Sequence, residues 1–265
     1  MKNKELQEIL NFAVSILIRS GVISRRYFRS VLNVHNKSDS EYDPVTRADK
    51  EVEEFLRRKI RKQYPEHGIV GEEYGGEEGK RYIWVIDPID GTRGYISGSP
   101  MWGSLLGLLR EKQPILGVMH QPLLRETFFA DTEGAWWKSG KQVKILRTRS
   151  VSNLNDAVLY CTHPTMFTTK AELRAFSFLE EKCSFSRFGA DCYGYCLLAA
   201  GFVDLVVESN LQAHDIIPLV PIIKSAGGIV TDWEGKLPLN GGRVIAASNK
   251  VLHREALQLL NQSSN

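Results

Sequence analysis

The chain has little cysteine for its length. Its 265 residues include only four cysteines, and no two of them form a CxxC pair. A domain built on disulfides needs a higher density of cysteine, and a zinc site needs closer spacing. We therefore interpret the four thiols as reduced and expect a cytoplasmic protein. They are Cys161, Cys183, Cys192 and Cys196.

The chain also lacks a strong excess of one charge. Its formal net charge is +3, which falls short of the basic footprint of a nucleic-acid-binding domain. The most basic strip, RRKIRK at residues 57–62, lies in an amphipathic helical pattern, which favours a solvated helix face over a nucleic-acid contact. We expect a small-molecule ligand and no nucleic-acid partner.

Long apolar runs, internal repeats and low-complexity tracts are missing as well. Residues 1–21 begin with lysines and then turn apolar, as an export signal does, but polar residues recur at helical spacing and no small-residue cleavage site follows. This pattern predicts an amphipathic surface helix. No segment approaches the roughly 20 apolar residues that span a bilayer, so we expect one compact unit with no membrane segment.

What is present is an ordinary globular composition, 43% hydrophobic and 25% charged. Residues 1–148 contain two helical patterns and then a series of strand patterns separated by turns, which predicts an α+β half with a largely antiparallel sheet and two helices on one face. Residues 149–265 alternate strand and helix patterns, which predicts an α/β half. The seam near residues 145–155 marks a change of architecture within one catalytic unit.

Several carboxylates stand at the ends of apolar segments. Glu72 and Glu73 follow GIVG, Asp87 and Asp90 lie in DPIDGT, and Asp215 lies in HDIIP. A carboxylate drawn into a low dielectric is costly unless it is paired or binds a metal, and few basic residues lie near these motifs. Oxygen ligands without a Cys or His cluster suit Mg²⁺ or Mn²⁺ better than zinc.

The DPIDGT stretch is the most specific of these signals. Its proline fixes the backbone between Asp87 and Asp90, so both side chains and the carbonyl of Ile89 can converge on one region. If a helix or tight turn begins at Gly91 and Thr92, their backbone N–H groups face the same region and form an anion site beside a cation site. Such a place suits a phosphate that is bound to metal.

Each carboxylate also has a simpler interpretation. Asp215 can be a helix cap or turn former, and Asp49 can complement the N-terminus of its helix. Glu72 and Glu73 can be solvated loop charges. The local sequence leaves these alternatives open.

Four motifs in order resemble the inositol monophosphatase-like family of metal-dependent phosphatases. They are DPVTRAD from Asp43, GEE, WVIDPIDGT and, far downstream, an aspartate that opens a helix ending in AGG. The resemblance runs from about Asp43 to Gly235. It implies an αβαβα layered sandwich of the α/β class, hydrolysis of a phosphate monoester by water, two or three Mg²⁺ ions per site with Mn²⁺ as a substitute, and a homodimer.

The resemblance also implies roles for individual residues. The metal ligands would be Glu72, Asp87, the Ile89 carbonyl, Asp90 and Asp215. Glu72 counts among the catalytic residues too. Asp49 and Thr92 would orient and deprotonate the attacking water, and Gly91 and Thr92 would bind the phosphate through their backbone. Metal ions of this kind activate water and stabilise the leaving alkoxide.

One departure from the family pattern is visible in HDIIP. The inositol-specific members usually have a tryptophan before the aspartate, whereas this chain has His214. We interpret His214 as a packing or supporting residue, because Mg²⁺ sites seldom recruit imidazole. In the helix that follows, Pro218 is tolerable near the N-terminus, while Pro221 is expected to distort the helix.

The stretches around HPTMF and DCYGYC resemble the histidinol-phosphate phosphatase branch of the family, which works in histidine biosynthesis. Histidinol phosphate carries an ammonium group and an imidazole, so carboxylates near its leaving group would favour it over inositol phosphate. The candidates are Asp191 and Glu208. Asp191 can also serve as the N-cap of the helix that it precedes.

Two alternatives to this substrate remain open at this point. One is an inositol-1-monophosphatase or a broad phosphatase of sugar and polyol esters, since one fold serves many substrates. The other, of a different class, is a nucleic-acid-associated regulatory protein that retains the fold.

Overall fold

The structure is a computed structural model that describes residues 3–30, 35–36, 44–76 and 80–262. Asp43, where the DPVTRAD motif begins, lies outside these residues. The first layer consists of two helices, α1 (Asn3–Tyr27) and α2 (Arg47–Gln63). Their apolar faces pack on one side of a large sheet, and residues such as Leu10, Leu17 and Leu56 have no exposed surface. The predicted amphipathic N-terminal helix is confirmed.

Within the described residues, α1 contains the one segment that is long and apolar enough to cross a membrane by length and composition. This segment, Lys4–Tyr27, reaches a mean hydropathy of 1.4 over its best window, and half of that window is buried inside the protein. A core helix passes the same test, and here the apolar stripe faces the sheet.

The second layer is an eight-stranded sheet. All its neighbouring strands are antiparallel except β3 and β5, which are parallel, so the prediction of a largely antiparallel sheet is confirmed. A separate two-stranded ladder joins β1 (His35–Asn36) and β2 (Pro44–Val45). In spatial order the sheet contains β10 (Gln142–Ile145), β9 (Ala135–Ser139), β8 (Glu126–Ala130), β7 (Gln113–Gln121), β6 (Gly103–Arg110), β5 (Tyr82–Asp90), β3 (Gly68–Gly71) and β4 (Gly75–Gly76).

A third layer of helices lies between this sheet and the next. It contains α5 (Cys192–Ala199), α6 (Ala213–Ile216) and α7 (Leu219–Ser225). These helices approach the sheet closely, because a Cβ atom on Gly117 of β7 would lie 1.8 Å from the carbonyl oxygen of Pro218. Only glycine fits at that contact.

The expected distortion at Pro221 is wrong, whereas Pro218 lies at the N-terminus of a helix, as expected. The helical pattern breaks at Pro218, between α6 and α7, whereas Pro221 lies inside α7 without ending it. Pro221 is the third residue of α7, where a backbone N–H has no partner within the helix, so its loss costs little there. Pro218 is the N-cap of α7, and because it has no N–H it cannot continue the hydrogen bonding of α6.

The fourth layer is a five-stranded sheet, and the fifth consists of α4 (Lys170–Glu180) and α8 (Lys250–Gln262). Strand β11 is parallel to both of its neighbours, while the other pairs are antiparallel, so the sheet is mixed. Short 3₁₀ turns, η1 (Leu154–Asp156) and η2 (Pro164–Met166), flank β11. In spatial order the strands are β12 (Phe185–Phe188), β11 (Val158–Cys161), β13 (Leu205–Leu211), β15 (Gly242–Ala247) and β14 (Ile229–Asp232).

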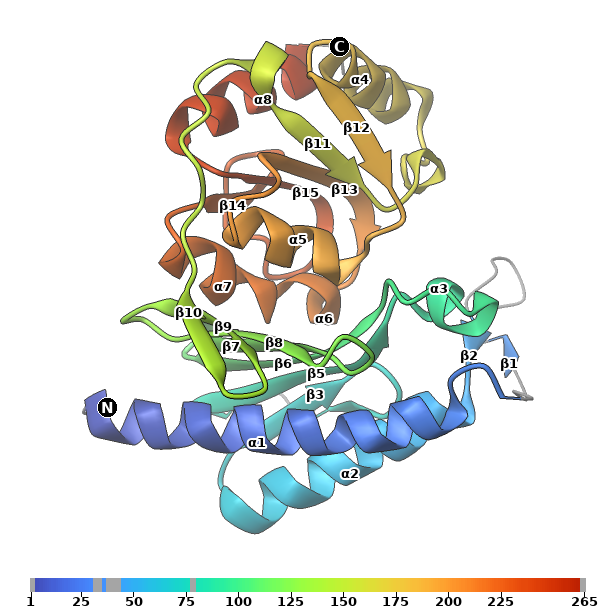
Figure 1. The fold of residues 1–265 in the computed structure, drawn as a ribbon, viewed down its shortest axis with the longest axis vertical. Coiled ribbons are helices and arrows are strands. Elements are labelled where there is room, and N and C mark those ends of the chain that lie inside the picture. The colour runs from blue at the N-terminus through green and yellow to red at the C-terminus, as the bar shows by residue number, and fades with distance from the viewer. Residues whose placement is uncertain (1–2, 31–34, 37–43, 77–79, 263–265) are drawn as a thin grey trace.

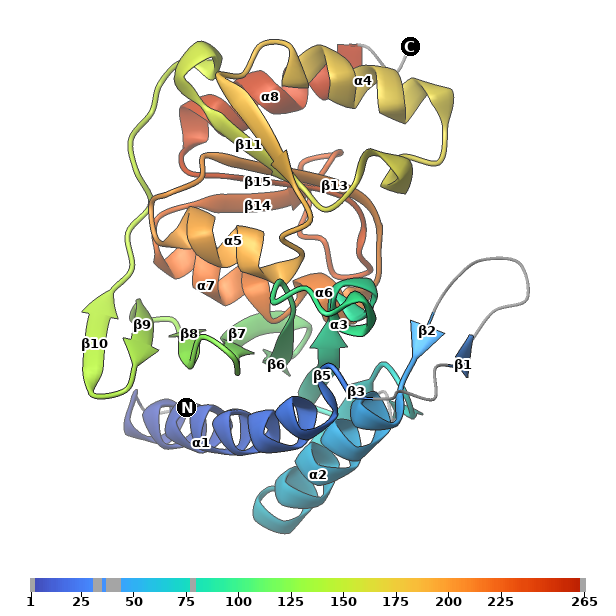
Figure 2. The same ribbon diagram turned by 45° about the vertical axis from the view of Figure 1, so that its right-hand side comes forward.

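Figures 1 and 2 show these layers stacked in the order helix, sheet, helix, sheet, helix, with α1 and α2 at one end and α4 and α8 at the other. The αβαβα sandwich and the α/β class are therefore confirmed. Three large apolar clusters fill the spaces between the layers. The division at residues 148 and 149 remains a prediction.

Candidate active site

The site begins at the end of β5, where a bulge turns two aspartates to the same face. Asp87 pairs with Leu105 of β6 and Asp90 pairs with Gly103, so three steps along β5 match two along β6. Side chains alternate between faces along a strand, and residues three apart would normally point in opposite directions. The extra residue of the bulge corrects this, and carboxylate oxygens of Asp87 and Asp90 come within 4.8 Å of each other.

Glu72 reaches the same place because β3 is parallel to β5. Gly71, the last residue of β3, pairs with Ile86, and the backbone N–H of Glu72 donates to the Ile86 carbonyl at 3.2 Å. The carboxyl ends of the two strands therefore meet at one edge. Glu72 is partly buried there beside Asp87, which argues against a fully solvated loop charge.

Asp215 comes from the other half of the chain, in the short helix α6. Figure 2 shows α6 lying beyond the end of β5. One carboxylate oxygen from each of Asp87, Asp90 and Asp215 lies within 4.8 Å of the other two. Asp215 also accepts a hydrogen bond from the Gln212 N–H at 2.7 Å, as part of a capping box. The capping interpretation is thus correct for one oxygen and does not exclude a second role.

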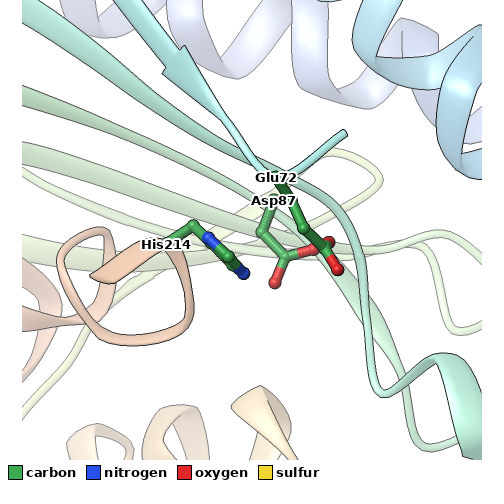
Figure 3. Close-up of side chains that lie close together, drawn as sticks. All are labelled: Glu72, Asp87 and His214. Carbon is green, nitrogen blue, oxygen red and sulfur yellow. The ribbon is translucent and has the colours of Figure 1, made fainter. Parts of the chain in front are cut away.

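His214 adds a nitrogen donor to this cluster. Donor atoms of Glu72, Asp87 and His214 lie within 4.8 Å of one another, and Figure 3 shows the imidazole pointing toward the two carboxylates. Asp87 therefore belongs to two neighbouring groups of donors, one with Glu72 and His214, the other with Asp90 and Asp215.

The electrostatics of the cluster favour a positive partner. Burial raises the pKa of Asp87 well above its ordinary value, and the charges of Glu72, Asp90 and Asp215 raise it further. Burial likewise raises the pKa of Asp90 and of Asp215. Asp87 Oδ1 is buried without a hydrogen-bond partner among the described residues. A divalent cation would satisfy that atom and offset the repulsion, so the donor set fits the implied metal.

The residues after Asp90 form the expected turn and helix. Gly91 adopts a left-handed conformation, with φ of 83°, at the N-cap of α3 (Thr92–Ser97). A Cβ atom on Gly91 would lie 3.0 Å from the Met101 carbonyl oxygen and 3.1 Å from Asp191 Cγ, so glycine is required. Thr92 Oγ1 donates to the Ile89 carbonyl at 3.0 Å. That carbonyl keeps a second lone pair for another partner.

Asp49 lies near this cluster, at the start of α2. It belongs to a capping box, in which its carboxylate accepts hydrogen bonds from the backbone N–H and the hydroxyl of Thr46. Burial raises the pKa of Asp49 to about 7, and the charge of Glu72 adds to the shift. The helix-terminus interpretation is correct, and the carboxyl group remains poised to exchange a proton near neutral pH.

Asp191 and Glu208 line a pocket of about 140 Å³ that also touches Asp90 and Asp215. Glu208 is buried and accepts hydrogen bonds from the Thr162 N–H at 2.8 Å and the Tyr195 hydroxyl at 2.9 Å. Burial raises the pKa of Glu208, and it raises that of Asp191 to about 7.

Asp191 occupies the N-cap position of α5, but its side chain does not cap the helix. The first N–H of α5, from Cys192, donates instead to Asp90 Oδ2 at 2.6 Å. Asp191 also has φ of 47°, an unfavourable conformation for a residue with a side chain. The capping alternative is therefore wrong, and Asp191 is held in a strained backbone facing the pocket.

A buried ion pair supports the loop that carries Glu72, and sequence reasoning missed it. Glu53 of α2 has no exposed surface, and Arg57 donates to it at 2.7 Å. Glu53 also accepts from the N–H groups of Glu73, at 2.8 Å, and Tyr74, at 3.3 Å. Arg57 belongs to the basic strip 57–62, which the sequence analysis predicted to be a solvated helix face. The prediction is confirmed for Arg58, which is exposed. It is wrong for Arg57, because Arg57 lies on the sheet side of α2.

Other pocket residues were missed as well. Thr162, Tyr195 and Asn210 line it, and Asn210 has φ of 61°, a conformation that asparagine adopts more readily than most residues. The sequence analysis gave none of them a role, although Tyr195 lies in the DCYGYC stretch and Thr162 directly precedes the HPTMF stretch.

Comparison with known proteins agrees with this geometry. The model of the inositol monophosphatase family matches residues 5–265. The bifunctional phosphatase IMPL2 of Arabidopsis thaliana is 38% identical, over 98% of this chain and 77% of that protein. A histidinol-phosphatase of Mycobacterium tuberculosis is 31% identical, over 95% of this chain and 97% of that protein. The solved structure of an inositol monophosphatase from Zymomonas mobilis is 35% identical, with a TM-score of 0.85 over 96% of this chain and 98% of that one.

Proposed function

The chain belongs to the inositol monophosphatase family, whose members are metal-dependent phosphatases, and from this premise we propose that it hydrolyses L-histidinol phosphate to L-histidinol and phosphate. The reaction would serve histidine biosynthesis, with Mg²⁺ as the cofactor and Mn²⁺ as a substitute. We also propose a cytoplasmic homodimer.

The observation that carries the substrate is the acidity of the pocket. Its described lining includes four carboxylates, Asp90, Asp191, Glu208 and Asp215, and no lysine, arginine or histidine. Two of them, Asp90 and Asp215, would be engaged by metal ions. Asp191 and Glu208 remain for a cationic leaving group. An inositol ring carries only hydroxyl groups and would bring no positive charge to Glu208 or Asp191, although the charge of Arg93 already acts on Asp191.

Glu208 would hold the ammonium group by hydrogen bonds. Each oxygen of Glu208 already accepts one hydrogen bond and keeps a free lone pair. These bonds fix the carboxylate in one orientation, so that little side-chain entropy is lost on binding. The M. tuberculosis relative that bears the name histidinol-phosphatase supports the same substrate.

The metal ions would be held by Glu72, Asp87, the Ile89 carbonyl, Asp90 and Asp215, with two or three ions in the site. When bound, they would neutralise the phosphate, make water a better nucleophile and stabilise the leaving alkoxide. The bulge in β5 and the parallel pairing of β3 keep these donors together before any ligand arrives. Such preorganisation limits the reorganisation required during the reaction.

The remaining steps fall to the protein's own groups. Asp49 would accept a proton from the attacking water, with its carboxyl group held in place by Thr46, and Thr92 would orient that water. The N–H groups of Gly91 and Thr92 would donate to the phosphate oxygens. Water adds at phosphorus, the ester P–O bond breaks, and the leaving alkoxide takes up a proton to give the alcohol.

The test is phosphate release by the purified protein with Mg²⁺, comparing L-histidinol phosphate with inositol 1-phosphate. Asp90→Asn is the blank. Asp191→Asn is expected to raise the KM for histidinol phosphate much more than the KM for inositol 1-phosphate, because only the former has a charge for Asp191 to bind. Equal effects on both esters would contradict the assignment of Asp191.

Other outcomes would select the alternatives. A preference for inositol 1-phosphate or for sugar esters would keep the mechanism and replace the substrate. Strong, salt-dependent RNA binding without metal-dependent hydrolysis would favour the regulatory alternative. Light scattering of the purified protein would test the homodimer.

A further inference from the structure

The imidazole of His214 lies at the edge of the carboxylate cluster. Its Nε2 is 3.4 Å from Asp215 Oδ1, and only 20% of the side chain is exposed. A nitrogen of the ring and one oxygen each of Glu72 and Asp87 lie within 4.8 Å of one another. Figure 3 shows the ring extending from α6 toward the two carboxylates, which come from β5 and the end of β3.

This spacing suits three ligands of one ion. Two donors that each lie about 2.1–2.2 Å from a divalent cation are at most about 4.4 Å apart. The observed group meets that limit after side-chain shifts of a few tenths of an ångström. A second observation points to a cation at the same place, because buried Asp87 Oδ1 has no hydrogen-bond partner within the described chain.

A nitrogen ligand changes which metal the site prefers. Mg²⁺ binds oxygen donors and keeps several waters, whereas Mn²⁺, Co²⁺ and Zn²⁺ accept imidazole readily. A site formed by Glu72 and Asp87 alone offers only oxygen. Replacing one water ligand by imidazole therefore favours the transition metals over Mg²⁺.

We propose that His214 is a direct ligand of the cation shared by Glu72 and Asp87, and that it shifts the preference of this site from Mg²⁺ toward Mn²⁺. This assignment rests on the proposed metal-dependent function. It replaces the sequence-based interpretation of His214 as a packing or supporting residue. The alternative is that His214 pairs with Asp215 and does not contact the metal, and the experiment distinguishes these two arrangements.

The experiment uses the full-length protein loaded with Mn²⁺ and pulsed electron paramagnetic resonance, which detects nitrogen bound directly to manganese. The wild-type protein is expected to show strong ¹⁴N modulation, and growth on ¹⁵N-labelled histidine is expected to change its frequencies. This measurement requires neither a variant nor catalytic activity of the protein. His214→Phe keeps a planar ring without a donor and is expected to abolish the modulation, while His163→Asn, at an exposed histidine outside the cluster, is expected to leave it intact.

Calorimetric titrations with Mn²⁺ and Mg²⁺ give a second readout. His214→Phe is expected to weaken Mn²⁺ binding roughly tenfold or more, in line with the loss of a metal-site residue, with a smaller effect on Mg²⁺. Mn²⁺ that binds to the wild-type protein without nitrogen modulation would overturn this assignment and leave the proposed function intact. A wild-type protein that binds neither ion would overturn both.

Discussion

The ion pair between Glu53 and Arg57 is the feature whose removal gives the sharpest test of the structure. Their side chains are 0% and 10% exposed, and Glu53 accepts from two backbone N–H groups next to Glu72. A Cβ atom on Gly71 would lie 2.1 Å from Glu53 Oε1, so the carboxylate is pressed against the end of β3. Arg57 also donates to the carbonyl of Gly75, on the far side of the same loop.

The substitution that tests this pair is Arg57→Met, which removes the positive charge while keeping most of the apolar part of the side chain. Breaking a buried pair on one side costs about 3–5 kcal/mol, because the remaining charge stays buried without compensation. Glu53 keeps two amide donors, so we expect the lower end, about 3 kcal/mol. For a chain of this size this corresponds to a fall in Tm of roughly 6–12 °C.

The assay is urea unfolding followed by circular dichroism, together with calorimetric Mg²⁺ titration. The double variant Glu53→Gln, Arg57→Met is expected to recover part of the lost stability, since it no longer buries a charge. Mg²⁺ affinity is expected to fall roughly tenfold in Arg57→Met, because the loop that positions Glu72 loosens.

A matched control exists on the same helix. Arg47 and Glu51 form an ion pair with the same spacing, but their side chains are 74% and 28% exposed. Arg47→Met is therefore expected to leave stability unchanged within error. The reasoning would be refuted if Arg57→Met unfolded at the same urea concentration as the wild type, or if the two arginine variants behaved alike.

Three further predictions concern the cluster, a buried histidine and a glycine. Without metal, the raised pKa values of Asp87, Asp90 and Asp215 mean that the folded protein binds more protons than the unfolded protein above about pH 4. The stability of the metal-free protein should therefore fall as pH rises, and Mg²⁺ should raise the Tm more at pH 8 than at pH 5. Parallel curves of Tm against pH in EDTA and in Mg²⁺ would contradict this. Burial lowers the pKa of His120 to about 4. With saturating Mg²⁺, the free energy of unfolding should therefore fall by roughly 3 kcal/mol as pH falls from about 6.5 to 4. His120→Asn should flatten this dependence of the unfolding free energy on pH, as measured by unfolding titrations. Gly91→Ala should destabilise the protein more than Gly140→Ala in the same titration, because both glycines have positive φ but only Gly91 has neighbours within 4 Å of a Cβ atom; equal losses would argue against the close approach of Asp191.

The order of layers and the acidic cluster could be predicted from sequence because both depend on local patterns. Apolar periodicity marked α1 and most strands of the large sheet, and Asp87 and Asp90 stood out in one short motif. Asp215 lies more than a hundred residues away, and only the family resemblance connected it to them.

What could not be predicted depends on contacts between distant segments. Arg57 looks like its neighbour Arg58 in the sequence, and only the packing of α2 on the sheet separates a buried guanidinium from a solvated one. Asp191 has the residue type and position of an N-cap, yet the first N–H of α5 donates to Asp90, a residue 102 positions earlier. The break at Pro218 depends on where the first turn of α7 begins, which the position of the prolines alone does not determine.

The bulge in β5 makes the cluster sensitive to the number of residues between its members. Substituting Pro88 or Ile89 changes what fills the space, whereas deleting either residue would restore regular pairing with β6 and leave Asp87 and Asp90 on one face, two positions apart and without the bulge between them. An insertion of one residue in the facing segment, between Gly103 and Leu105, would also restore regular pairing, but it would turn Asp90 to the side of the sheet opposite Asp87. Descendants of this sequence can therefore vary in composition along these two segments far more freely than in length.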